Sequence, residues 1–284
     1  MSRSKVYLGM MLVIAVVPAF AHSAGDLQVQ PQLRSSAFLV LDETSSSVLF
    51  SRHAEVPTPI ASITKLMTAL VVLDSAQSLD ETLTVTDADR EHGRGAFSRL
   101  AIGAQLSRAD LLHLALMSSE NRAAHALGRN YPGGVPAFVQ AMNSKAALLG
   151  MSSAHFVDPS GLSSQNVASP ADLVHLVNAA AGHPVIRQYS TDRDHSVRVG
   201  RRLLEYRNTD LLVKSPAWNI IVQKTGYISE AGRCLVLKTV IKGRSVVMVL
   251  LDSFGKYTRT ADAQRIRKWL EGRLVEATVA ANPA

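Results

Sequence analysis

Ser62 and Lys65 stand three residues apart, at the expected start of a helix. Residues at this spacing share one face of a helix, so the Lys65 amine can reach the Ser62 hydroxyl. A serine at a helix N-terminus also lies among free backbone N–H groups, which can stabilise an oxyanion. For Lys65 to accept the serine proton near neutral pH, burial and a second cation must disfavour its charged form. The pair predicts a serine nucleophile, although about one S-x-x-K segment arises by chance in such a chain, and Ser2 and Lys5 form another.

A second motif, Ser119-Glu120-Asn121, is expected on a turn between two helices. A hydroxyl and an amide two residues apart on a turn can point the same way, one relaying protons and the other holding a carbonyl. Taken alone, Ser119 is better explained as a helix-capping residue. Ser164-Gln165-Asn166 matches the pattern equally well, and Glu120, the middle residue, is expected to face solvent.

The third motif, Lys224-Thr225-Gly226, lies at the end of a predicted strand. Glycine allows the backbone of a ligand to run beside a strand edge, and lysine and threonine supply a cation and a hydroxyl for a carbonyl or carboxylate. Composition predicts only about 0.03 such tripeptides in this chain, so this motif is the most specific of the three.

The elements that must position these motifs are strands near both chain ends and helices between them. Residues 37–41 and 48–50 flank a polar turn and predict a hairpin. After Pro57 and Pro59, apolar residues at helical spacing predict a helix over 63–73, which Ser62 is placed to cap. Further helices are expected from Ser107 with Asp110, from Pro136 to Gly150, and from Ser169 to about Gly182.

The pattern changes after Trp218. Residues 219–223, 233–241 and 245–251 are rich in β-branched residues and predict strands, followed by an amphipathic helix over about 258–270. Five strands drawn from both chain ends predict one sheet built across a helical subdomain. We therefore expect a sheet lobe of residues 34–75 and 190–272, a helical lobe of residues 76–189 and a flexible tail of residues 273–284.

Composition excludes several classes of protein. The 284 residues are 47% hydrophobic and 19% charged, which is ordinary for a globular chain. The only cysteine, Cys234, cannot form an intramolecular disulfide and is expected to be a packed core thiol. No histidines have metal-ligand spacing, so neither a metal nor another cofactor is predicted. Basic residues are scattered without interleaved aromatics, so the net charge of +7 does not indicate nucleic acid binding.

The first residues predict an export signal. Arg3 and Lys5 form a basic start, residues 6–20 carry no charge, and Ala19-Phe20-Ala21 fits a signal-peptidase site. Ala21-His22-Ser23 is a second cleavage register, and an uncleaved anchor is the alternative. We expect residues 1–21 to be a signal peptide and the mature protein to be periplasmic. Its basic charge predicts at most peripheral membrane contact.

The three motifs in this order resemble those of the serine D-alanyl-D-alanine peptidases, the low-molecular-mass penicillin-binding proteins. The resemblance covers nearly all of the expected mature chain and includes residues 59–62 and 156–162. Within that family, residues 116–124 and 252–257 look most like the D-alanyl-D-alanine endopeptidase branch (penicillin-binding protein 7/8 type). The resemblance implies an α/β fold of the β-lactamase/DD-peptidase type, with a five-stranded antiparallel sheet flanked by helices and an inserted all-helical subdomain.

The resemblance also implies a role for each motif residue. Ser62 would be the acylated nucleophile, Lys65 its general base, and Ser119 the proton donor to the leaving amine. Substrate would be held by the side chains or backbone of five further residues: Asn121, Lys224, Thr225, Gly226 and Tyr227. The backbone N–H groups of Ser62 and Tyr227 would form the oxyanion hole. The implied reaction is hydrolysis of D-alanyl-diaminopimelate cross-links between peptidoglycan stem peptides, with β-lactams as covalent inhibitors.

Three alternatives remain open at this point. Carboxypeptidase relatives continue into a C-terminal β-rich domain and an anchoring helix, whereas this chain ends about a dozen residues after Leu270, which favours the endopeptidase. A β-lactamase needs a carboxylate for deacylation, and Asp158, within a turn typical of the family, is the only acid between Met151 and Ser169. The third alternative is a wall-binding or penicillin-sensing module without turnover. Arg233 and Arg244 could meet a stem-peptide carboxylate but are better explained as sheet-edge charges.

Overall fold

The computed structural model describes residues 30–90 and 98–281, and the chain from Pro31 onward forms one compact unit. The expected signal peptide, together with Ser2 and Lys5, lies outside the described residues.

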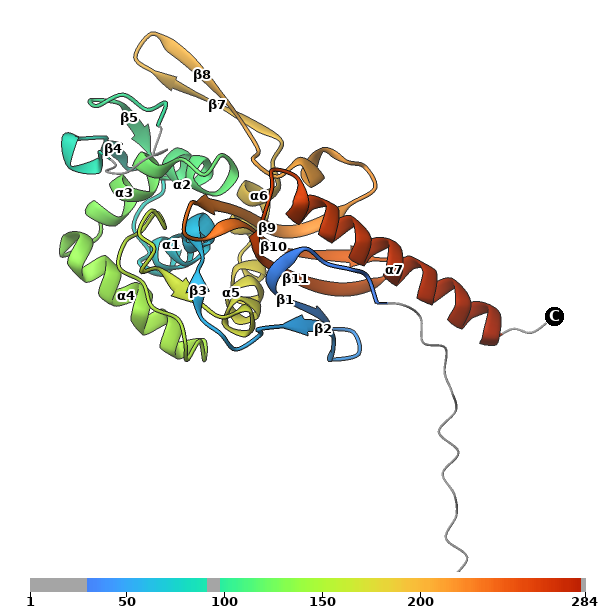
Figure 1. Cartoon of the computed structure of the whole chain (residues 1–284). Helices are drawn as coiled ribbons and strands as arrows, with labels where there is room; N and C mark the ends of the chain where they lie inside the picture. The colour runs from blue at the N-terminus through green and yellow to red at the C-terminus, as the bar shows by residue number, and fades with distance from the viewer. Residues whose placement is uncertain (1–29, 91–97, 282–284) are drawn as a thin grey trace, which may run out of the picture. The chain divides into compact units, whose positions relative to one another are not determined.

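The central sheet has five antiparallel strands, as predicted, and the structure gives their order as β2-β1-β11-β10-β9 (Figure 1). They are β1 (Ser35–Asp42), β2 (Ser47–Arg52), β9 (Asn219–Ile228), β10 (Gly232–Ile241) and β11 (Arg244–Ser253). β11 lies at the centre and joins β1, from the start of the chain, to β10. β9 is an edge strand and continues to Ile228, so the Lys224 motif lies within the strand and not at its end as expected.

Both faces of the sheet are buried, because successive strand residues point to opposite sides. On β11, Met248 and Leu250 belong to a cluster that includes Ile266 of α7 (Thr258–Ala281). Val247 and Val249 belong to a second cluster with the other helices, among which α5 contacts β9, β10, β11 and β1. This double burial explains the continuous apolar run of the strand.

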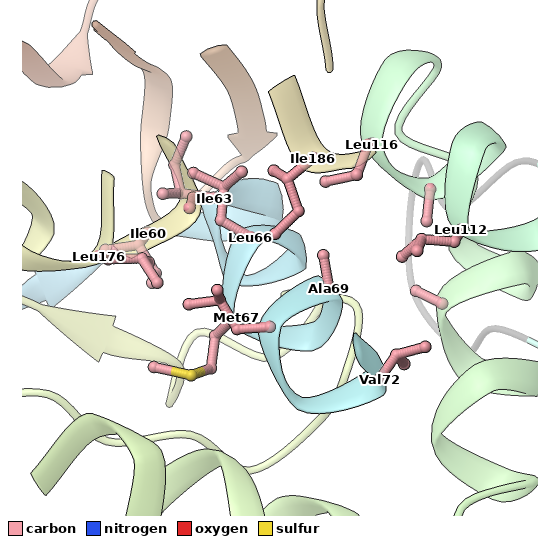
Figure 2. Close-up of a cluster of buried hydrophobic side chains, with 14 of the residues drawn as sticks. Ile60, Ile63, Leu66, Met67, Ala69, Val72, Leu112, Leu116, Leu176 and Ile186 are labelled. Atoms are coloured by element: carbon pink, nitrogen blue, oxygen red, sulfur yellow. The ribbon is translucent and has the colours of Figure 1, made fainter. Parts of the chain in front are cut away.

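Helix α1 lies at the centre of the larger cluster (Figure 2). Its first nine residues are all buried, and Leu66 and Ala69 lie among side chains from other helices, such as Leu116 and Ile186. The helices packed around one another and the sheet are α1 (Thr64–Asp74), α2 (Arg108–Met117), α3 (Asn121–Arg129), α4 (Gly134–Leu148), α5 (Pro170–Gly182) and α6 (Pro184–Thr191). Lys65 lies in the first turn of this buried helix, and Ser62 lies just before the helix begins.

Two predicted helix caps are confirmed and one is wrong. The hydroxyls of Ser107 and Ser169 accept from the N–H groups of Asp110 and Asp172 at the starts of α2 and α5. Ser62 does not cap α1: it lies inside the 3₁₀ helix η1 (Ala61–Ile63), and the N-cap of α1 is Ile63. The hydroxyl of Ser62 therefore does not satisfy the helix end.

Other elements were not predicted. Helix α6 follows α5 directly, and a hairpin of β7 (Asp194–Val199) and β8 (Arg202–Arg207) follows α6. The helix α7 continues to Ala281, past the expected end near Leu270, because no helix-breaking proline occurs before Pro283. The remaining short elements are β3 (Thr58–Pro59), β4 (Thr82–Thr84), β5 (Gln105–Ser107), β6 (Val167–Ala168), η2 (Asp87–Asp89) and η3 (Leu211–Lys214). Within residues 30–90 and 98–281, no helix combines the length and apolar character needed to cross a bilayer.

Candidate active site

Ser62 and Lys65 are in direct contact. The Lys65 Nζ lies 2.8 Å from the Ser62 Oγ, and Lys65 has no exposed surface. The same Nζ lies 2.8 Å from the Asn121 Oδ1 and 2.6 Å from the Ser160 carbonyl oxygen. An amide oxygen and a carbonyl oxygen can only accept, whereas a hydroxyl can also donate. Of these three partners, Ser62 is therefore the one that can pass a proton to the amine.

The carbonyl of Ser160 is held in place by Asp158. Asp158 Oδ1 accepts from the backbone N–H groups of Ser160 and Gly161 and from the Ser160 hydroxyl, all at 2.7 Å, and Oδ2 accepts from the N–H of Ser163 at 3.0 Å. Burial alone would raise the pKa of Asp158, but these hydrogen bonds outweigh it and lower the pKa. The ionised Asp158 carboxylate therefore holds the shape of the loop behind Lys65. Because its oxygens accept these hydrogen bonds, it is poorly placed to act as a base in deacylation.

The second motif faces a second buried lysine. Ser119 has a left-handed backbone (φ 63°), and its Oγ accepts from the Lys224 Nζ at 3.0 Å. The N-cap of α3 is Glu120, so the explanation of Ser119 as a capping residue is wrong. Lys224 also donates to the Thr225 carbonyl at 2.8 Å. Its burial, followed by repulsion from Lys65 and Arg259, lowers the pKa of Lys224 well below its ordinary range, against the attraction of Asp210.

The two glycines nearest the nucleophile are required by close backbone packing. A Cβ on Gly226 would lie 3.0 Å from the Ile60 carbonyl oxygen and 3.1 Å from the Ser62 nitrogen. A Cβ on Gly161 (φ +80°) would lie 2.0 Å from the Ala61 carbonyl oxygen. Ala61 itself has a φ of 48°, a strained value for a residue with a side chain. The segment carrying Ser62 is therefore clamped between β9 and the Asp158 loop.

These groups open onto one cavity of about 240 Å³. Thr209 on its wall shares a 2.6 Å hydrogen bond between hydroxyls with Thr225. Arg259, from the first turn of α7, donates to the Gly226 carbonyl at 2.7 Å. The cavity is lined by Ser62, Ser119, Asn121, Leu162, Thr209, Thr225, Gly226, Tyr227, Ile228, Ser229 and Arg259. Serine, threonine, amide and guanidinium groups line this cavity, and the two buried lysines contact it through Ser62 and Ser119, a set that suits attack on a carbonyl beside a carboxylate.

Comparison with known proteins agrees with this geometry. A family model described as D-alanyl-D-alanine carboxypeptidase (Peptidase_S11) matches residues 25–255. The chain belongs to this family. It is a serine D-Ala-D-Ala peptidase with the α/β fold of the DD-peptidases.

Two relatives share nearly the whole chain. It is 47% identical to a D-alanyl-D-alanine endopeptidase of Pseudomonas aeruginosa, over 100% of this chain and 92% of the relative. It is 44% identical to a D-alanyl-D-alanine endopeptidase of Escherichia coli, over 96% of this chain and 90% of the relative. Among solved structures, a D-alanyl-D-alanine carboxypeptidase of Mycobacterium tuberculosis superposes with a TM-score of 0.78 at 29% identity, covering 88% and 95% of the two chains.

The structure thus brings all the predicted site residues to one place. The second match to the Ser119 motif, Ser164-Gln165-Asn166, does not line the cavity. Asn166 serves the loop instead, because its Oδ1 accepts from the Val157 and Asp158 N–H groups and its amide donates to Thr64. Glu120 corrects an expectation: it is 6% exposed, not solvent-facing, and accepts from the Arg99 N–H beneath the β7–β8 hairpin.

Sequence reasoning missed Thr209, Arg259 and the role of the Asp158 loop. No local pattern marks Thr209 or Arg259. Thr209 is placed by the hydrogen bond from its N–H to the Met117 carbonyl, and Arg259 by the packing of α7 on β10 and β11. Cys234 is buried as expected, and burial raises the pKa of its thiol to about 11. Arg233 and Arg244 are partnered, by the Tyr227 ring and the Asp42 carboxylate respectively. Across the described part of the chain, no three His, Cys, Asp or Glu side chains are grouped to hold a metal ion.

Proposed function

We propose that this protein is a periplasmic serine DD-endopeptidase that hydrolyses D-alanyl-diaminopimelate cross-links in peptidoglycan. The observation that carries the proposal is the Lys65 amine, buried and bonded to the Ser62 hydroxyl, with two further partners that can only accept. The relatives of similar length that share 44–47% of their residues are endopeptidases by name.

Acylation starts with transfer of the Ser62 proton to the Lys65 amine, which must be neutral to accept it. The Ser62 Oγ forms a bond to the D-alanyl carbonyl carbon, and the carbonyl oxygen takes the negative charge against the backbone N–H groups of Ser62 and Tyr227. Asn121 holds the carbonyl on the acyl side. These roles rest on the contacts described above and on the family resemblance.

Collapse of this intermediate breaks the C–N bond and releases the diaminopimelate amine. Ser119, whose Oγ accepts a hydrogen bond from Lys224, gives its proton to that nitrogen and receives in exchange the proton that Lys65 took from Ser62, so Lys65 is neutral again. The carboxylate beside the released amine is held by Thr225 and Arg259, which face the same cavity. Water then hydrolyses the acyl-enzyme. A β-lactam would acylate Ser62 by the same route and leave slowly.

The test uses the purified chain, cross-linked muropeptide dimers and labelled benzylpenicillin. The wild type should cut dimers to monomers and gain one labelled adduct at Ser62, and Ser62→Ala should do neither. Ser47→Ala, an exposed serine on β2, is the matched control and should behave as wild type. Unchanged cleavage by Ser62→Ala would refute the mechanism. Release of D-alanine from pentapeptide monomers with intact dimers would make the enzyme a carboxypeptidase instead.

A further inference from the structure

Three large aromatic side chains are exposed beside the cavity. Among the described residues, Tyr227 is 55% exposed, Phe254 93% and Tyr257 57%. A phenylalanine exposed to this degree leaves its apolar surface without a partner inside the chain. Exposed apolar surface gathered at one place often marks a binding surface.

Tyr227 lies on β9, and Phe254 and Tyr257 lie in the turn between β11 and α7, at the same end of the sheet. Arg233 of β10 pairs with Tyr227 of β9 on one side and with Ser253 of β11 on the other. The Arg233 guanidinium carbon lies 4.4 Å from the centre of the Tyr227 ring. Phe254 directly follows Ser253, and Lys256 lies 5.4 Å from the centre of the Tyr257 ring. We call Tyr227, Arg233, Phe254, Lys256 and Tyr257 the aromatic rim.

The backbone beneath the aromatic rim is fixed. Gly232 (φ +60°) approaches Asp252 so closely that a Cβ would lie 2.5 Å from the Asp252 Oδ1 and 3.0 Å from its Cα. The hydroxyl of Thr258 donates to the Phe254 carbonyl. The side chain of Phe254 is therefore exposed on a turn whose backbone is held by these contacts. A ligand that binds there does not have to pay the entropy cost of ordering a loop.

The aromatic rim is continuous with the active-site cavity. Tyr227 belongs to both, and Arg259, two residues after Tyr257, lines the cavity and bonds to the neighbouring Gly226. Figure 1 shows the start of α7 beside the end of the sheet to which β9 and β10 belong. A substrate whose scissile bond lies at Ser62 can therefore extend over the aromatic rim.

We propose that the aromatic rim binds the glycan strand of the cross-linked substrate. This inference rests on the proposed function. The C–H face of a pyranose ring is apolar and packs on aromatic rings, while its hydroxyls stay hydrated. Arg233 and Lys256 supply cations for carboxylates carried by the substituents of the sugar. Exposed aromatics with a lysine would also suit an anionic lipid surface, but continuity with the cavity through Tyr227 favours the glycan.

The test compares the double variant Phe254→Ala, Tyr257→Ala with Leu148→Ala, a control that removes an equally exposed apolar side chain (83%) from α4. In a Ser62→Ala background, co-sedimentation with purified sacculi measures binding without cleavage. In the enzyme that keeps Ser62, endopeptidase rates are measured on glycan-bearing dimers and on sugar-free stem-peptide dimers. Binding of the same variants to vesicles containing phosphatidylglycerol tests whether the aromatic rim binds an anionic lipid surface instead.

We expect roughly 10-fold weaker sacculus binding and slower cleavage of glycan-bearing dimers, the usual scale for losing central aromatic contacts. Sugar-free dimers and labelled penicillin should react within about twofold of the wild-type rates. Unchanged sacculus binding, or equal loss on both dimers, would overturn the proposal, as would a loss confined to vesicle binding. If the wild type binds sacculi through the aromatic rim but cuts no dimer, the proposed function fails and the glycan inference stands.

Discussion

Replacing Asp158 with asparagine tests the loop that holds Lys65. The substitution keeps the shape and the Oδ1 acceptor, but its NH₂ group would face the Ser163 N–H, donor against donor, across the present 3.0 Å contact. Losing one charge-assisted hydrogen bond and leaving an N–H without a partner costs about 1.5–3 kcal/mol. The three remaining bonds to Oδ1 also weaken without the negative charge, so we expect about 2–4 kcal/mol in total.

For a domain of this size, that loss lowers the Tm by roughly 5–15 °C. Because the Ser160 carbonyl shifts with the loop, acylation by labelled penicillin should also slow by roughly tenfold or more. Asp158 has a lowered pKa in the fold, so its stabilisation is present above the pKa of the unfolded chain. It is lost as the pH falls through the folded pKa.

Thermal unfolding from pH 3 to 8 and stopped-flow acylation measure both effects. The difference in Tm between wild type and Asp158→Asn should narrow below about pH 4. Asp87→Asn, an exposed carboxylate in a surface ion pair, is the matched control and should change the Tm little. A variant with wild-type Tm and wild-type acylation would show that the carboxylate does not organise the loop, and the reasoning would be wrong.

Three further changes probe the cavity wall. Thr209→Val removes the 2.6 Å hydrogen bond to Thr225 and should slow acylation by roughly fivefold at an unchanged Tm, so a wild-type rate would rule out a positioning role. Gly226→Ala places a Cβ 3.1 Å from the Ser62 nitrogen and should slow acylation by roughly tenfold or more; an unaffected rate would mean that this segment can retreat freely. Burial raises the pKa of Asp210 to about 6, so the folded state holds a proton between about pH 4 and 6 that the unfolded chain has lost. Stability therefore falls as the pH rises through this window, Asp210→Asn should flatten the Tm profile there, and identical profiles would contradict the shift.

Local patterns predicted the parts of the fold that local chemistry decides. Ser107 and Ser169 cap helices because each hydroxyl meets an N–H only three residues away. The hairpin of β1 and β2 and the five strands follow from apolar residues and a polar turn. The spacing of Ser62 and Lys65 likewise predicts their contact, which the structure confirms.

What the sequence could not show depends on distant partners. β9 continues through Gln223 and Lys224, buried polar residues that look like a strand end until Asn208 and Ser119 satisfy them. In the β7–β8 hairpin, apolar and polar residues alternate only over three residues a strand, Val197–Val199 and Leu204–Tyr206, which is too short a run to predict a strand. Glu120 is buried, and its carboxylate accepts from the N–H of Arg99, whose guanidinium lies over the Tyr206 ring of β8, so its partners lie outside its own motif.

The pairing of β1 with β11 joins Ser35 to Ser253, across most of the described chain. A loop of this length closes slowly, and a chain interrupted before Ser253 lacks the strand that connects β1 to β10. The chain must therefore extend to Ser253 before the sheet that carries the lysine strand can close onto β1. We expect molecules that end before Ser253 to form no penicillin adduct.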